Sequence, residues 1–357
     1  MSQLLEEILS RENMLLAYKR VKANKGAGGV DGITIEEVDK YLKENWIDIR
    51  DKIRRRKYKP KPVKRVEIPK PNGGLRNLGI PTVVDRIIEQ AIAQRLTPIV
   101  EPHFSENSYG FRPGRRAQQA VIKLLEYFND GYTYVVDIDL EKFFDNVPQD
   151  KLMTLVHKLI NDPDTESLIR KYLNAGVMIK GRYEETGKGT PQGGNLSPLL
   201  SNIMLNELDK ELERRGLHFV RYADDCVIAV GSSAAANRVM HTVTSWIERK
   251  LGLKVNMTKT KVTKPGRLKY LGFGFWKDAE ARPHQDSVLK FKRALKQLTK
   301  RSWSVSMDYR IERLNQEIRG WINYFRIGSM KTALQKIDEH LRTRMRIVIW
   351  KQWKKAT

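Results

Sequence analysis

Cysteine is nearly absent from this chain: Cys226 is the only one among 357 residues. One cysteine excludes a disulfide framework and any zinc site built from several thiolates. The six histidines have no metal-ligand spacing such as H-E-x-x-H. No apolar run approaches the roughly 20 residues that span a bilayer, and the polar start, Met1 to Glu7, is unlike a signal peptide. We therefore expect a reduced cytosolic protein with no membrane partner.

Acidic residues are too few to balance the basic ones, which leaves a net charge of +24. Residues 50–76 hold twelve Lys/Arg against two Asp/Glu, and residues 281–357 hold nineteen against six. This excess predicts a polyanionic partner, most commonly nucleic acid, although a highly soluble basic protein is the plainer explanation. Because single cores stop growing near ~250–300 residues, more than one domain is expected.

Hydrophobic periodicity predicts a mixture of helices and short strands. The chain becomes helical from Ser287 onwards, where Trp321 is expected to pack between helices. Helices are predicted at 35–57, with Thr34 as N-cap, and at 83–100. A hairpin is predicted at 63–80, and strands at 132–140 and 268–275. Residues 219–230 are predicted to form two short strands around a tight turn at Asp224.

Two groups of aspartates give the clearest chemical signal. Asp224 and Asp225 stand at a predicted turn between apolar strands, where like charges repel unless a cation neutralises them. Asp137 and Asp139 alternate onto one face of the predicted strand 132–140. If these strands are neighbours, their carboxylates can hold hard cations such as Mg²⁺ in a two-metal site. Each group alone also fits a structural role, as an Asp-Asp turn or as strand-end helix caps.

Nine short blocks follow one another along the chain: Lys25 to Gly32; Ile68 to Lys70 with Arg76 to Pro81; Asp85-Arg86; Tyr109 to Pro113; Asp139 to Asp145; Gly189 to Pro198; the Asp224-Asp225 turn; Lys259 to Lys261; and Tyr270 to Phe273. Leu314-Asn315 and Ile318 to Tyr324 come after them. In this order the nine blocks resemble, nearly from end to end, the reverse transcriptases encoded by group II introns. The C-terminal part also resembles the maturase domain of that family.

This resemblance implies an α+β right-hand polymerase with fingers, an antiparallel-sheet palm and a helical thumb or maturase domain. The expected divisions are 1–130 for an N-terminal extension and fingers that lead into palm helices, 131–280 for the palm with its catalytic strands, and 281–357 for the thumb; residues 150–188 belong partly to the fingers. It also implies an RNA-directed DNA polymerase that binds intron RNA as a splicing maturase, in the bacterial cytosol or at the nucleoid.

The resemblance further implies residue roles. Asp139, Asp224 and Asp225 would be the catalytic metal ligands, for Mg²⁺ with Mn²⁺ as a possible substitute, and Asp137 would be structural. Phe144, five residues after Asp139, would exclude a ribose 2′-hydroxyl. The other nucleotide contacts would be Lys70 and Arg76 at the triphosphate, Gln192 at the nucleotide or base pair, and Lys259 as an acid toward pyrophosphate. The nucleic-acid contacts would be Arg112, Arg342, Arg344, Arg346, Lys351 and Lys354.

Several alternatives stay open at this point. The chain could act as a polymerase, as an RNA-binding maturase, or as both; intact carboxylates favour retained polymerase activity. A retron or diversity-generating enzyme fits the 189–198 block and the C-terminal part less well, and a viral RNA polymerase more often has Gly-Asp-Asp at the turn. The expected partners are intron RNA, an RNA template with a DNA primer, and dNTPs, while the oligomeric state is undecided. Without a Cys/His-rich nuclease, the chain is either a trimmed piece or a naturally short member of the family.

Overall fold

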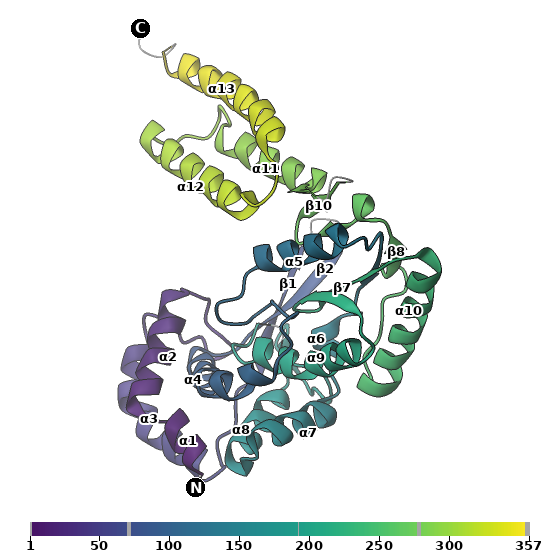
Figure 1. Cartoon of the computed structure of the whole chain (residues 1–357). Coiled ribbons are helices and arrows are strands. Elements are labelled where there is room, and N and C mark those ends of the chain that lie inside the picture. The colour runs from purple at the N-terminus through teal and green to yellow at the C-terminus, as the bar shows by residue number, and fades with distance from the viewer. Residues whose placement is uncertain (1, 70–72, 192, 277–279, 354–357) are drawn as a thin grey trace.

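A computed structural model describes residues 2–69, 73–191, 193–276 and 280–353 (Figure 1). The N-terminal helices lie at one end of the molecule and the last three helices at the other. No helix in these ranges combines the length and apolar character needed to cross a membrane.

The longer helices are α1 (Gln3–Ile8), α2 (Arg11–Ala23), α3 (Val38–Arg54), α4 (Val83–Val100), α5 (Ala117–Asn129), α7 (Gln149–Ile160), α8 (Pro163–Leu173), α9 (Ser197–Arg214), α10 (Ser233–Trp246), α11 (Gln285–Leu298), α12 (Met307–Phe325) and α13 (Lys331–Trp353).

A four-stranded antiparallel sheet forms the middle of the molecule, in the order β6-β7-β3-β8. Its strands are β3 (Tyr134–Ile138), β6 (His218–Tyr222), β7 (Asp225–Val230) and β8 (Lys261–Thr263). The expected hairpin around Asp224 is therefore present as β6 and β7. Both faces are covered, since alternate residues of each strand enter two different cores. Val136, Ile138 and Ile228 join the main core with α4 and α9, and Val135 and Val227 pack toward α5.

A second sheet carries the basic hairpin. β1 (Val63–Pro69) and β2 (Leu75–Ile80) pair antiparallel, with Ile68 opposite Arg76, as the sequence predicts. β4 (Val177–Ile179) runs parallel to β1 and pairs with β5 (Arg182–Glu184), which gives the order β2-β1-β4-β5. The hairpin is thus anchored to a segment about a hundred residues further along the chain.

The C-terminal helices form a separate small core. Phe291, Leu295, Leu314 and Ile337 are buried together at the centre of α11, α12 and α13. The Trp321 ring stacks on Phe291, with 4.6 Å between ring centroids and 7° between planes. The prediction that Trp321 packs between helices is confirmed.

Two predicted elements differ from the structure. α3 begins at Val38 rather than Ile35, because Thr34 and Glu37 exchange hydrogen bonds in a turn before the helix. The single strand predicted at 268–275 is wrong: it is two short strands, β9 (Lys269–Tyr270) and β10 (Phe273–Phe275), paired as a hairpin. Leu271 and Gly272 between them both have positive φ, which extended backbone cannot have. β10 also pairs with β11 (Ala281–Pro283).

Candidate active site

The sheet register brings the aspartates together. Ile138 on β3 lies opposite Cys226 on β7, so one residue further along Asp139 lies opposite Asp225. Residues directly opposite in an antiparallel pair point to the same face, and so do residues two apart on one strand. Asp137, Asp139 and Asp225 therefore share one face of the sheet, at the end where the β6–β7 turn also presents Asp224. The juxtaposition expected if the strands were neighbours is present.

The carboxylates repel one another. The pKa of Asp225 is raised to about 6, first by desolvation and then by the negative charges of the other three aspartates, while Lys259 opposes the rise. The pKa of Asp137 is also raised, mainly because its side chain is half-buried. Lys261 opposes that shift, and the charge of Asp139 adds to it. The cluster therefore carries more negative charge than its surroundings neutralise.

Lys259 provides part of the missing positive charge. Its Nζ lies 3.4 Å from Oδ2 of Asp139. Two hydrogen bonds to the backbone of Asp139 hold the 256–260 segment in place: Thr260 Oγ1 accepts from the Asp139 N–H at 3.1 Å, and the Asn256 N–H donates to the Asp139 carbonyl at 2.8 Å. Lys259 thus lies beside the aspartates, and its role toward pyrophosphate stays a prediction.

The donor set suits a hard divalent cation. Among the described residues, no three His, Cys, Asp or Glu side chains are already drawn together as a formed metal site. The aspartates nevertheless supply oxygen ligands only, which Mg²⁺ prefers. A divalent cation would also offset the repulsion that raises the pKa of Asp225. The residues present therefore fit such an ion.

Phe144 lies at a cavity lined by the sheet that carries the basic hairpin and by the glycine-rich loop. It belongs to the short helix α6 (Phe143–Asn146) and packs edge-on against Phe143, with 5.3 Å between ring centroids. Its carbonyl accepts from the Thr190 N–H at 2.7 Å, which attaches the glycine-rich loop to α6. The cavity measures about 440 Å³, and its lining includes Arg65, Asn77 and Gly79 of the hairpin together with Phe144, Asp145, Thr190 and Pro191.

Three predicted nucleotide contacts are only partly covered by the structure. Lys70 and Gln192 lie outside the described residues. The backbone of Arg76 lies on β2, paired with Ile68, and its side chain is outside the described part. Their roles stay predictions.

Arg112 corrects one expectation. Its side chain is 3% exposed, and it donates to Glu101 Oε1 and to the Ser108 carbonyl, both at 2.8 Å. A guanidinium buried on partners of its own chain is not available to phosphates. The prediction that Arg112 binds nucleic acid is therefore wrong, and the residue instead holds the Tyr109 to Pro113 loop.

The predicted cations of α13 differ in their surroundings. Arg342 and Arg346 are exposed, and Arg342 pairs with Asp338 of the same helix at 2.8 Å. Arg344 is half-buried and donates to Thr299 Oγ1 at 2.6 Å, so it links α13 to the end of α11. For the last two cations, Lys351 Nζ donates to the Arg301 carbonyl at 3.0 Å, and Lys354 lies outside the described residues.

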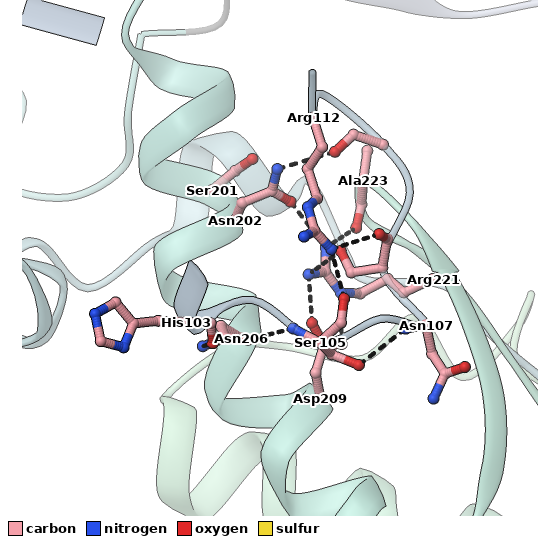
Figure 2. A network of polar contacts seen from close by, with 12 residues as sticks. His103, Ser105, Asn107, Arg112, Ser201, Asn202, Asn206, Asp209, Arg221 and Ala223 are labelled. Atoms are coloured by element: carbon pink, nitrogen blue, oxygen red, sulfur yellow. Dashed lines mark hydrogen bonds and ion pairs between the residues drawn. The ribbon is translucent and has the colours of Figure 1, made fainter. Parts of the chain in front are cut away.

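A buried polar network that the sequence reading missed lies behind the aspartate turn (Figure 2). Arg221 of β6 and Asp209 of α9 form an ion pair with 2.7 and 2.5 Å contacts, and neither side chain is more than 1% exposed. The available signal was an arginine inside the apolar strand just before the two aspartates, and an acid on the apolar face of a helix.

Glu89 is a second buried acid outside the predicted set. Its Oε2 accepts from the backbone N–H of Asn195 at 2.6 Å, just before α9 begins. Burial, followed by the charge of Asp85, raises the pKa of Glu89 to about 8. It connects α4 to the glycine-rich loop that also contacts Phe144.

Comparison with known proteins gives two family matches. Residues 68–275 match the reverse transcriptase (RNA-dependent DNA polymerase) family, and residues 288–357 match the group II intron maturase-specific domain. Protein YkfC of Escherichia coli is 34% identical over 300 residues, which cover 73% of this chain and 79% of that protein. The group II intron-encoded protein LtrA of Lactococcus lactis is 37% identical over 221 residues, 62% of this chain and 37% of LtrA. The chain thus spans well under half the length of LtrA.

Among solved structures, telomerase from Candida albicans has a similar fold. The TM-score is 0.50 at 15% identity, and the match covers 84% of this chain and 59% of that one. This likeness concerns the fold alone. It agrees with the mixed helix-and-sheet architecture described above, and the expected right-hand polymerase fold of class α+β is confirmed.

Proposed function

Because this chain belongs to the reverse transcriptases encoded by group II introns, we propose that it copies an RNA template into DNA by adding dNTPs to a primer 3′-hydroxyl. The observation that carries the proposal is the aspartate cluster formed by β3 and the β6–β7 turn. Phosphoryl transfer needs positioning and neutralisation of charge, and this site has no need of a histidine base or a cysteine nucleophile.

In this proposal Asp139, Asp224 and Asp225 hold divalent cations, with Mg²⁺ as the native ion and Mn²⁺ as a substitute. Such ions, when bound, activate the primer hydroxyl and stabilise the leaving pyrophosphate. Asp137 orients its neighbours. Lys259, whose Nζ lies 3.4 Å from Asp139, reduces the repulsion among the carboxylates, and its proposed role is to donate a proton to pyrophosphate. Lys70 and Arg76 bind the triphosphate, and Gln192 contacts the nucleotide.

Primer extension tests this function. The purified chain is given an RNA template annealed to a DNA primer, with dNTPs or rNTPs, and with Mg²⁺, Mn²⁺ or EDTA. We expect full-length DNA with dNTPs and either ion, little product with rNTPs, and none with EDTA. An absence of template-directed product under all metal conditions would contradict the proposal.

Phe144 is predicted to select the sugar. Shortening it to Val opens space at the nucleotide cavity, so an added 2′-hydroxyl is no longer excluded. Because a small steric difference in a pocket is worth about tenfold or more in discrimination, the rNTP-to-dNTP ratio of kcat/KM should rise by about that factor. Single-nucleotide addition with each substrate measures it.

Phe143→Val is the matched control for this change. Phe143 is the adjacent aromatic, 2% exposed and packed into the main core. Its shortening should lower the unfolding temperature and leave the sugar ratio unchanged. A ratio that does not move in Phe144→Val would mean that Phe144 only packs beneath the site.

The exposed cations of α13 are predicted to hold the duplex. Replacing Arg342 and Arg346 with Gln should weaken template–primer binding regardless of sequence. Each lost phosphate contact flattens the log–log salt dependence by about 0.9 on B-form DNA, so the slope should fall by about 1–2. The length of the products should fall by a larger factor than the rate of single-nucleotide addition.

Arg344→Gln is the contrast: it breaks the α13–α11 link and should lower the unfolding temperature instead. An unchanged slope in the double variant would place the duplex on another basic surface.

A second activity, assistance of intron splicing, is supported by the maturase-specific match over 288–357 and by the basic charge of that part. Binding of a group II intron RNA in preference to an unrelated structured RNA, measured at one fixed salt concentration, tests this role. Equal affinity for both RNAs would contradict it.

A further inference from the structure

The ion pair between Arg221 and Asp209 is bidentate: one edge of the guanidinium contacts both carboxylate oxygens. Arg221 Nε donates to Asp209 Oδ1 at 2.7 Å and Nη2 donates to Oδ2 at 2.5 Å, a two-point contact that only arginine can make. Asp209 and Asn202 are seven residues apart on α9 and so lie on one side of that helix. Both are fully buried. A buried pair of charges is by itself weak evidence for stability, because desolvation offsets most of the attraction.

The rest of the guanidinium is directed at the aspartate turn (Figure 2). Nη1 donates to the Ala223 carbonyl at 2.8 Å and to Asn202 Oδ1 at 3.1 Å, and Nη2 also donates to Ser108 Oγ at 2.8 Å. Ala223 immediately precedes Asp224. One side chain therefore connects α9, the Ser108 segment and the backbone of the turn that presents the two aspartates.

The turn has a conformation that must be held. Ala223 has φ of 57°, in the left-handed region that residues other than glycine seldom adopt. Such a backbone persists only where its surroundings determine it, and it is common at active sites. Three contacts determine it here: the Arg221 bond to the Ala223 carbonyl, the close approach of Gly110 to the Ala223 backbone, and the bond from Asn202 Nδ2 to the Gly110 carbonyl at 2.9 Å.

We propose that Arg221, held by Asp209, is a positioning residue that fixes the Ala223 backbone and so sets where Asp224 and Asp225 stand. This inference rests on the proposed polymerase function for its effect on rate. Loss of an ordinary core contact would lower stability alone. Loss of the Arg221 contacts should instead slow the chemical step and weaken metal binding by Asp224 and Asp225, while the affinities for dNTP and duplex stay the same.

Arg221→Lys is the main test. A lysine keeps a positive charge beside Asp209 but cannot also bond the Ala223 carbonyl, Asn202 and Ser108. The maximal rate of single-nucleotide addition, at saturating dNTP and duplex, should fall about 10²-fold, the size expected for a displacement of reacting groups of about 1 Å. The dissociation constants for dNTP and duplex should change less than about threefold, which is within one lost hydrogen bond.

A second readout does not depend on polymerisation. Tb³⁺ binding is followed by luminescence sensitised by the neighbouring Tyr222, with the Asp224→Ala/Asp225→Ala chain as background. Arg221→Lys should weaken the part of the titration that depends on these aspartates. If the wild-type chain extends no primer, the polymerase function fails, whereas the Tb³⁺ comparison still reports on the turn.

Arg310→Lys is the matched control. Arg310 is as buried as Arg221, 2% exposed, and bonds backbone carbonyls of Leu298 and Trp303 in the C-terminal helices. It should lower the unfolding temperature and leave the maximal rate and the Tb³⁺ titration unchanged. If Arg221→Lys does not fold, Ser108→Ala removes the hydrogen bond between Ser108 Oγ and Arg221 Nη2 and should slow addition about 2–10-fold. A folded Arg221→Lys or Ser108→Ala chain with wild-type maximal rate and Tb³⁺ titration would overturn the proposal.

Discussion

Replacing Asp224 and Asp225 together with Ala should reduce template-directed DNA synthesis by about 10³-fold or more, a loss typical of removing the electrostatic stabilisers of a transition state. The site would keep only the carboxylates of Asp137 and Asp139, too few to hold two cations. Primer extension with dNTPs and Mg²⁺ measures the loss. Duplex binding should be unchanged, because the exposed cations of the C-terminal helices are untouched.

The same variant should fold at least as well as the wild type. Its aspartates repel one another without a cation, and that repulsion raises the pKa of Asp225. Thermal unfolding without divalent ions should therefore give an equal or higher midpoint. Asp137→Asn is the matched control, since it keeps the shape of an aspartate on the neighbouring strand β3 and on the same face of the sheet. It should retain most activity, and a loss as large as that of the double variant would make Asp137 a metal ligand. Extension by the double variant at the wild-type rate would refute the site.

Gly110→Ala should disable the enzyme although Gly110 is not one of the aspartates. A Cβ there would overlap the backbone nitrogen of Ala223 and lie 2.9 Å from the Tyr222 carbonyl carbon. These are backbone atoms that cannot swing aside, so the turn itself must move. Overpacking of this kind costs about 1–3 kcal/mol, and a shift of about 1 Å at reacting groups costs about 10²-fold in rate.

Gly231→Ala is the control for this variant. Gly231 follows β7, and a Cβ there meets no atom within 4 Å. It should keep both stability and activity. The informative measurement is the single-turnover rate at a temperature where both variants are folded, checked by circular dichroism. A fully active Gly110→Ala chain would show that the turn tolerates displacement, and would weaken the positioning role of the network behind it.

Some of the fold could be predicted because its cause is local. Helix α4 begins and ends where the apolar periodicity predicts, at Val83 and Val100. The basic hairpin follows from two strand-like runs around a glycine-containing turn. The strand predicted at 268–275 failed because positive φ at Leu271 and Gly272 divides it, and leucine gives no warning of that conformation.

In the candidate site, too, some residues could be predicted from the sequence and others could not. The aspartates and Phe144 could be named from motifs, since each motif is a short contiguous run. Which arginines are buried on partners of their own chain could not be predicted from motifs. Arg112 and Arg344 look like the other cations in the sequence, yet one is buried on Glu101 and the other bonds Thr299. The importance of Arg221 was equally hidden, because its meaning depends on Asp209 and Ser108.

By itself, the sequence determined the family, the order of the blocks and the chemistry of the acidic residues, all properties of neighbours along the chain. Only the tertiary structure decided which charges are free to act. A guanidinium that is buried on partners of its own chain, as those of Arg112 and Arg221 are, cannot reach a substrate, and some of those partners lie far along the chain. The packing of α9 and the Ser108 segment against β6 makes Arg221 part of the aspartate turn, while exposure leaves Arg346 open to phosphates.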